Sequence, residues 1–191
     1  RKPGAPCSAQ SQTPGGKVRG KNADGGEEIA AAAEAKLGRR TPLEAVKLPP
    51  YYPDHPDIRR DWAAYLDSVR MTDVMVGEVI ARLKREGVLE NTLVIFMTDH
   101  GISHARGKQF LYDEGIHVPL VIAGPGVKAG AVRHDVVEHI DIAALSLAAA
   151  QIGVPDYMQA RDILAKDYQP RAAAFSARDR CAETVERLRP V

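Results

Sequence analysis

Apolar side chains recur every three or four positions between Pro56 and Gly87. This spacing places them along one side of a helix and predicts a long amphipathic helix whose apolar stripe packs on a sheet. Pro56 suits the first helical turn, Asp54 lies close enough to cap it, and Gly87 is a suitable stop. The stripe contains Trp62, Tyr65, Leu66, Val69, Val76, Val79, Ile80 and Leu83.

Two short apolar runs follow that helix and have the composition of strands. Residues 92–97 (TLVIFM) are continuously apolar and rich in branched side chains, which is typical of a strand buried on both faces. Residues 118–123 (VPLVIA) predict a second strand, which a Gly-Pro-Gly turn closes. Such a succession indicates the α/β class, here a partial sheet flanked by helices. Later segments predict a helix over 140–152, a strand over 173–176 and a helix over 183–189.

The first 45 residues differ in composition from the rest of the chain. Residues 1–50 contain no Phe, Tyr or Trp, and glycine is frequent. Such a segment buries too little apolar surface to offset the entropy lost on ordering, although residues 27–37 have the composition of a short helix. We therefore predict a low-complexity, disordered tail over 1–45 and one folded domain over 46–191.

The overall composition is that of an ordinary globular domain. The 191 residues carry a formal net charge of +1 and are 45% hydrophobic, and this small charge gives no general attraction to nucleic acid or to an anionic membrane. The two cysteines, Cys7 and Cys181, are too few for a disulfide framework or a zinc cluster. No apolar run reaches the roughly 18 residues that a membrane span needs, and no signal peptide is visible.

Residues with metal-binding and anion-binding chemistry follow the first predicted strand. Asp99 and His100 come directly after it, at the strand end where ligands bind in open α/β sheets. A carboxylate oxygen and an imidazole nitrogen are both metal ligands, and Gly101 allows a sharp turn after them. Lys108 lies on a glycine-flanked loop and has the charge to hold an anion. Taken alone, these residues also fit a polar turn and a solvated surface lysine.

The stretch over residues 93–126 gives these residues a more specific interpretation. Its segments LVIFMTDHG, GKQFLYDEGIHVP and LVIAGPG together resemble the C-terminal part of the catalytic domain of type I sulfatases, a family of the alkaline phosphatase superfamily. The resemblance implies that Asp99 and His100 bind a divalent cation, usually calcium, and that Lys108 contacts the sulfate group. The likeness extends over about residues 46–191. The positions that match the scaffold of the motif are Tyr112, Glu114, Gly115 and Pro119.

The same resemblance implies a sulfuric ester hydrolase, with a sulfated small molecule or glycan as substrate and a periplasmic or extracellular location. Members of the family use formylglycine as nucleophile, formed from a Cys or Ser in the pattern C/S-x-P-x-R. That pattern does not occur in this sequence, because Cys7 lacks both the proline and the arginine. We therefore expect that the nucleophile segment is missing from this chain and that the chain alone is inactive.

Other polar residues leave alternatives open. His104 lies between the metal pair and Lys108, and either lines the site or belongs to a polar loop. His55 suits a helix entry better than a catalytic role, and Arg178 and Arg180 suit surface positions better than contacts to an anionic substrate. Two other functions fit the same residues: a phosphonate or phosphate monoester hydrolase of the same superfamily, and a non-catalytic, degenerate binding domain.

Overall fold

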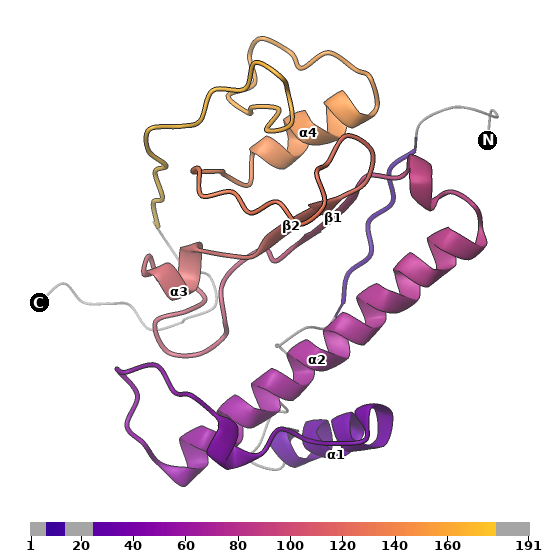
Figure 1. Ribbon diagram of the computed structural model, residues 1–191. Helices are drawn as coiled ribbons and strands as arrows, with labels where there is room; N and C mark the ends of the chain where they lie inside the picture. Colours follow the sequence, from indigo (N-terminus) through magenta and orange to yellow (C-terminus); the bar gives the residue numbers. More distant parts are fainter. Residues whose placement is uncertain (1–6, 14–24, 179–191) are drawn as a thin grey trace, which may run out of the picture. The chain divides into compact units, whose positions relative to one another are not determined.

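The computed structural model describes residues 7–13 and 25–178. The chain folds as two units: residues 10–89, the N-terminal unit, and residues 90–191 together with 1–9, the C-terminal unit. Figure 1 shows the long helix of the first unit and the paired strands of the second. Among the described residues, no helix is both long enough and apolar enough to span a membrane.

The N-terminal unit is built from two α-helices and a short 3-10 turn. Helix α1 covers Gly25–Leu37, η2 covers Leu43–Ala45 and α2 covers Pro56–Arg85. Helices α1 and α2 pack on each other (Figure 1). The apolar periodicity therefore predicted α2 correctly, as one helix of 30 residues.

Small side chains make the contact between α1 and α2. Ala33 is fully buried, Ala64 is 3% exposed, and a Cβ placed on Gly26 would touch the Ala64 methyl group at 3.5 Å. Because small residues let the two backbones approach, a segment poor in large apolar side chains still buries one face. The prediction of a disordered N-terminal tail is therefore wrong from residue 25 onward. Apart from residues 7–13, the rest of that predicted tail lies outside the described residues.

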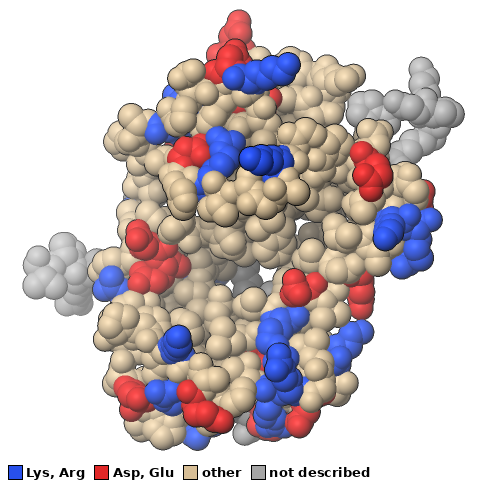
Figure 2. Space-filling model, in the orientation of Figure 1, with Lys and Arg blue, Asp and Glu red and all other residues tan. Residues whose placement is uncertain are grey.

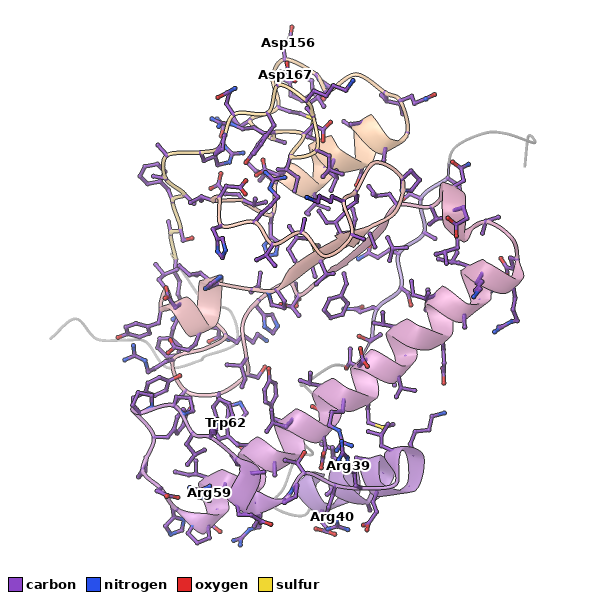
Figure 3. All side chains as sticks on the ribbon, in the orientation of Figure 1. Arg39, Arg40, Arg59, Trp62, Asp156 and Asp167 are labelled. Atoms are coloured by element: carbon purple, nitrogen blue, oxygen red, sulfur yellow. The ribbon has the colours of Figure 1, made fainter. Side chains whose placement is uncertain are left out.

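Asp67 on α2 forms hydrogen bonds to the segment that joins the two helices. Its carboxylate is 1% exposed and accepts hydrogen bonds from the backbone N–H and the hydroxyl of Thr41, at 3.0 Å and 2.6 Å, and from Arg70 at 2.9 Å. Arg59, labelled on α2 in Figure 3, donates to the carbonyl of Val46 at 2.9 Å. The buried carboxylate is stable here because three donors replace its lost hydration.

Both ends of α2 carry caps. His55 caps the N-terminus, because its Nδ1 accepts a hydrogen bond from the backbone N–H of Asp57 at 3.2 Å. The predicted cap was Asp54, and this was wrong, since its carboxylate pairs instead with Arg59 at 2.5 Å. The predicted stop at Gly87 is confirmed: its φ of 68° closes a Schellman motif.

In the described residues, the C-terminal unit contains a two-stranded antiparallel sheet. Strand β1 covers Val94–Met97 and β2 covers Leu120–Ala123, with Val94 opposite Ala123. These strands together with the helices confirm the predicted α/β class. The other elements from residue 89 onward are η3 (Leu89–Asn91), α3 (Asp113–Ile116) and α4 (Asp141–Ala149).

The strands are shorter and less buried than predicted. Each begins two residues later than the apolar run that predicted it. Residues 94–96 are half-buried and Met97 is 39% exposed, whereas a strand buried on both faces was predicted. The physical reason is that β2 pairs with β1 at its edge through backbone hydrogen bonds and so covers neither of its faces.

The segments after β2 agree with prediction in part. The apolar run over 140–152 forms α4, although the helix is shorter than the run. The strand predicted over 173–176 is wrong, because these residues have no regular structure and the nearby backbone pairs through a single bridge between Val136 and Arg171. The helix predicted over 183–189 lies outside the described residues.

A buried ion cluster centred on Asp141 joins the start of α4 to the chain that follows it. Asp141 is fully buried, and its carboxylate accepts hydrogen bonds from the Arg171 guanidinium and from the backbone N–H groups of Glu138 and Arg161, at 2.9 Å and 2.8 Å. Arg171 also pairs with Glu138 at 2.9 Å. Burial by itself would raise the pKa of Asp141, but these hydrogen bonds outweigh it and hold the pKa below its ordinary value.

Candidate metal and anion site

Asp99 and His100 lie at the end of β1, with Thr98 between the strand and the pair. The Nε2 atom of His100 lies 3.5 Å from Oδ1 of Asp99. The Nδ1 atom of His100 lies 2.7 Å from the carbonyl oxygen of Gly101. The two predicted ligands therefore lie side by side, with the histidine partly buried and the carboxylate open to solvent.

The hydrogen bond to Gly101 determines the tautomer of His100. A carbonyl oxygen can only accept, so Nδ1 carries the proton and Nε2 keeps its lone pair when the ring is neutral. The Nε2 atom is buried and has no hydrogen-bond partner among the described residues. A metal-binding histidine has the same arrangement, with one nitrogen bound to a carbonyl oxygen and the other free to coordinate.

The donor types of this pair fit a divalent cation, but two donors do not complete a coordination sphere. Among the described residues, no group of three or more His, Cys, Asp or Glu side chains could hold a metal ion. Calcium takes about six to eight oxygen ligands. Asp99 and His100 would supply two positions, and the others would come from water, from substrate or from residues that the structure does not describe.

The loop after the pair closes through glycines that have no room for a side chain. The backbone N–H of Gly101 donates to the carbonyl of Gly115 at 3.0 Å. A Cβ placed on Gly101, Gly107 or Gly115 would lie 1.7, 1.9 or 2.1 Å from a backbone oxygen across the loop. The sequence predicts a turn at Gly101, and the structure shows that this glycine also provides space for the returning chain.

Lys108 lies within this closed loop, and its backbone returns toward Asp99 and His100. Its N–H donates to the carbonyl of Ile102, two residues after His100, at 2.6 Å. Arg106 and Gln109, close to Lys108 on either side, have φ of 68° and 77°, in the left-handed region that such residues rarely adopt. Backbone strain of this kind is common at ligand-binding loops. The Lys108 side chain is half-buried, and its orientation toward the metal pair stays a prediction.

Two further histidines belong to this region of the C-terminal unit. His139 Nε2 donates to the carbonyl of Thr98 at 2.9 Å, which ties the segment before α4 to the residue that precedes Asp99. Sequence reasoning missed this bond because the partner lies 41 residues away. His104 is half-buried in the loop, and its carbonyl accepts the N–H of Gly107 at 3.0 Å. That the His104 ring lines the site stays a prediction.

The remaining sequence candidates make no described contact with Asp99 or His100. Cys7 is an exposed free thiol. His55 is the cap of α2, in agreement with its predicted place at a helix entry. The guanidinium carbon of Arg178 lies 5.4 Å from the centre of the Phe110 ring, on the loop that carries Lys108. Arg180 and Cys181 lie outside the described residues.

A comparison with protein families covers most of the chain. The family model described as Sulfatase matches residues 5–152, a range that includes the Asp–His pair, Lys108 and both strands. The chain belongs to the sulfatase family. The family resemblance that the motifs over 93–126 carry is thereby confirmed.

Known sulfatases are also similar to this chain in sequence. An ulvan-active sulfatase from Formosa agariphila is 29% identical over 146 residues, which are 75% of this chain and 24% of that protein. Arylsulfatase K from Bos taurus is 35% identical over 112 residues, which are 56% of this chain and 21% of that protein. Arylsulfatase K from Homo sapiens gives the same identity, 35% over 112 residues, with 56% of this chain and 21% of that protein covered. The chain therefore spans about a quarter or less of the length of these relatives.

Proposed function

We propose that this chain forms part of a sulfuric ester hydrolase in which Asp99 and His100 hold a calcium ion and Lys108 binds the sulfate group. The observation that carries the proposal is the buried lone pair of His100 Nε2, held 3.5 Å from the Asp99 carboxylate. Membership of the sulfatase family supports the reaction class. The names of the relatives, an ulvan-active sulfatase and two arylsulfatases, support a sulfated glycan or small molecule as substrate.

Each residue of the site has a distinct chemical role in this proposal. A bound divalent cation supplies Lewis-acid chemistry by drawing charge from the sulfate oxygens. Asp99 supplies the negative charge that a calcium site needs, and Gly101 keeps the Nε2 lone pair of His100 available by holding the proton on Nδ1. Lys108 supplies a compact positive charge that stabilises the sulfate oxygens as charge develops on them.

Formylglycine does not fit any residue of this sequence, because the pattern C/S-x-P-x-R is absent from the 191 residues. Cys7 is exposed and lacks the proline and arginine of that pattern. The proposal therefore concerns the half of the site that binds the metal and the sulfate. The nucleophile of the working enzyme would come from residues beyond these 191.

Calcium titration of the 191-residue chain tests the metal assignment. We expect weak binding by calorimetry, with a dissociation constant of roughly 10⁻⁴–10⁻³ M, because the pair supplies few ligands. Asp99→Asn and His100→Gln should abolish the binding. Asp156→Asn, a matched change of an exposed carboxylate in the same unit, should not. Equal calcium affinity in the wild type and in Asp99→Asn would overturn the assignment.

The rates at which the protein hydrolyses a sulfate ester and a phosphate ester distinguish a sulfatase from the other candidate functions. The full-length protein should hydrolyse an aryl sulfate faster than the corresponding aryl phosphate. The reverse order would support a phosphonate or phosphate monoester hydrolase. Turnover of neither ester by a folded, calcium-binding full-length protein would support a non-catalytic binding domain.

A further inference from the structure

Two aromatic rings and two guanidinium groups contact one another in a row. Three of these side chains, Arg106, Phe110 and Tyr112, lie on or next to the loop that holds Lys108, and the fourth is Arg178. The Phe110 and Tyr112 rings are stacked, with centroids 6.3 Å apart and planes inclined by 25°. The guanidinium carbon of Arg106 lies 3.9 Å from the centre of the Tyr112 ring, and that of Arg178 lies 5.4 Å from the centre of the Phe110 ring. We call these four residues the arginine–aromatic platform.

The platform is open to solvent. Phe110 is 45% exposed and Tyr112 is 48% exposed, so neither ring serves mainly to fill a core. The Nε atom of Arg106 lies 3.9 Å from a carboxylate oxygen of Glu114, which helps to hold the guanidinium over the Tyr112 ring. Arg178 reaches the platform from a distant part of the sequence and is exposed. Adjacent exposed rings combined with arginines are the composition of a binding surface.

The platform and Lys108 belong to one tightly closed loop. Arg106 precedes Lys108 by two positions, so their Cα atoms lie within about 7 Å of each other at the maximum reach of about 3.6 Å per residue. The glycine contacts of this loop leave its backbone little freedom, since a Cβ at Gly107 would lie 1.9 Å from a backbone oxygen. The platform is therefore within reach of a ligand that is held at Lys108 and is longer than a single sulfate ester.

We propose that the arginine–aromatic platform binds a sugar ring and a second anionic group of a polyanionic carbohydrate, beside the sulfate that Lys108 holds. This inference rests on the proposed function and deepens it by naming the residues that select an extended, multiply charged substrate. The C–H groups of a sugar ring pack against the solvent-exposed parts of the Phe110 and Tyr112 rings, which the stacked neighbours and the guanidinium groups leave uncovered. The guanidinium groups of Arg106 and Arg178 form forked pairs with sulfate or carboxylate oxygens. These residues position the substrate and do not touch the reacting sulfur.

The charge distribution favours a carbohydrate over a nucleic acid as the ligand. The chain has a net charge of +1, and Figure 2 shows acidic side chains interspersed with basic ones on the visible face of the described residues. Nucleic acids bind through many phosphate contacts along a basic stripe, because the release of counterions drives their affinity. Two guanidinium groups beside two aromatic rings suit instead a carbohydrate whose anionic groups are separated by a sugar ring.

Binding of dextran sulfate to the 191-residue chain tests the proposal, with unsulfated dextran as the reference ligand. We expect Arg106→Gln and Arg178→Gln each to weaken dextran sulfate binding roughly tenfold, the effect of losing one charge-assisted contact. Phe110→Leu should also weaken it, since leucine keeps an apolar side chain and removes the aromatic ring on which Tyr112 and Arg178 are stacked. Arg85→Gln, which removes an exposed charge from α2, is the matched control and should have no effect. Since Arg178 is itself exposed, Arg178→Gln tests the proposal without disturbing the fold.

The outcomes separate this proposal from the proposed function. Unchanged dextran sulfate affinity in the three platform variants would overturn the platform. So would single-stranded DNA that binds as tightly as dextran sulfate with no effect of Phe110→Leu, because that result shows general electrostatic binding. Lys108→Ala should abolish the binding of inorganic sulfate and leave most of the dextran sulfate affinity. If Lys108→Ala leaves sulfate binding intact while the platform variants lose dextran sulfate, the sulfate assignment fails and the platform stands.

Discussion

The backbone N–H of Gly101 donates to the carbonyl of Gly115 at 3.0 Å, and this bond closes the loop that carries Lys108. A Cβ on Gly101 would lie 1.7 Å from the carbonyl oxygen of Glu114, far inside contact distance. The carbonyl of Gly101 also accepts the Nδ1 proton of His100 at 2.7 Å. One glycine therefore orients the proposed metal-binding histidine and also fixes the loop of the proposed sulfate-binding lysine.

Replacing Gly101 should disturb both functions together. We expect Gly101→Ala to destabilise the C-terminal unit by about 1–3 kcal/mol, the usual cost of overpacking, because the backbone across the loop must move. Thermal denaturation should show a lower Tm, and calorimetry should show weaker binding of calcium and of sulfate. Gly153→Ala is the control, because no atom lies within 4 Å of a Cβ at that exposed glycine. Normal calcium affinity in Gly101→Ala would contradict the coupling.

The sequence predicted the elements whose signals are local. The apolar stripe and Gly87 located α2 and its end, because helical periodicity and a left-handed stop both act within a few residues. The packing of α1 was not predicted, since it depends on how small residues such as Gly26 meet Ala64 on another helix. The cap at His55 was assigned to Asp54, because both are polar residues next to a proline and only the structure shows which one the backbone reaches.

The sequence predicted which residues form the candidate site, but it did not predict how their side chains are arranged. The strand followed by Asp99 and His100 could be read from the sequence, whereas the hydrogen bond that sets the tautomer of His100 could not. The platform was also missed: Arg178 was assigned to the surface, and its contact with Phe110 joins residues far apart in sequence. Long-range contacts of this kind leave no periodic signal in the sequence.

The buried cluster of Asp141 should make stability depend on pH. Burial favours a raised pKa for Asp141, but the hydrogen bond from Arg171 and two backbone N–H groups lower it below the ordinary value of about 3.9. The carboxylate therefore contributes stability above about pH 4 and loses that contribution as pH falls through the lowered folded-state pKa. Asp141→Asn should cost about 3–5 kcal/mol at neutral pH, the usual effect of removing one partner of a buried pair.

Urea denaturation at pH 7, 5 and 3 checks the Asp141 prediction. The free energy of unfolding of the wild type should fall toward pH 3 more steeply than that of Asp141→Asn. Part of the slope should survive in the variant, because the hydrogen bond from Arg133 lowers the pKa of Asp135 in the same direction. Asp167→Asn, at an exposed position, should behave as the wild type. An equally steep acid response in Asp141→Asn would show that this carboxylate is not responsible.

The contact between Asp67 and Thr41 should be measurable as a coupling energy. Asp67 is buried and accepts a hydrogen bond from the Thr41 hydroxyl at 2.6 Å. Either Asp67→Ala, which removes the acceptor, or Thr41→Val, which removes the donor, should therefore destabilise the chain by about 1–3 kcal/mol. A double-mutant cycle from urea denaturation should give a coupling of about 0.5–3 kcal/mol. Asp73→Ala, at an exposed position on α2, should stay within about 0.5 kcal/mol of the wild type. Strictly additive effects would refute the contact.

The 191-residue chain alone should show no turnover of an aryl sulfate, with or without calcium. The reason is chemical: no residue of this sequence fits the formylglycine precursor, and a metal held by Asp99 and His100 alone lacks the nucleophile it would assist. A colorimetric aryl sulfate assay at high protein concentration is the direct measurement. Calcium-dependent turnover that disappears in Cys7→Ala would show that Cys7 supplies the nucleophile after all.

In the full-length enzyme, Lys108→Ala should lower kcat by roughly 10²–10³, the usual effect of losing one group that stabilises a developing oxyanion. Calcium affinity should stay normal, because Lys108 carries no metal ligand, and this separates the variant from Asp99→Ala, which should lose calcium and turnover together. Lys108→Arg keeps the charge on a larger planar group and should recover only part of the rate. Steady-state kinetics with an aryl sulfate, beside calcium titrations of each variant, give the comparison. A Lys108→Ala enzyme with normal kcat would remove this lysine from the sulfate site, whatever the calcium titrations show.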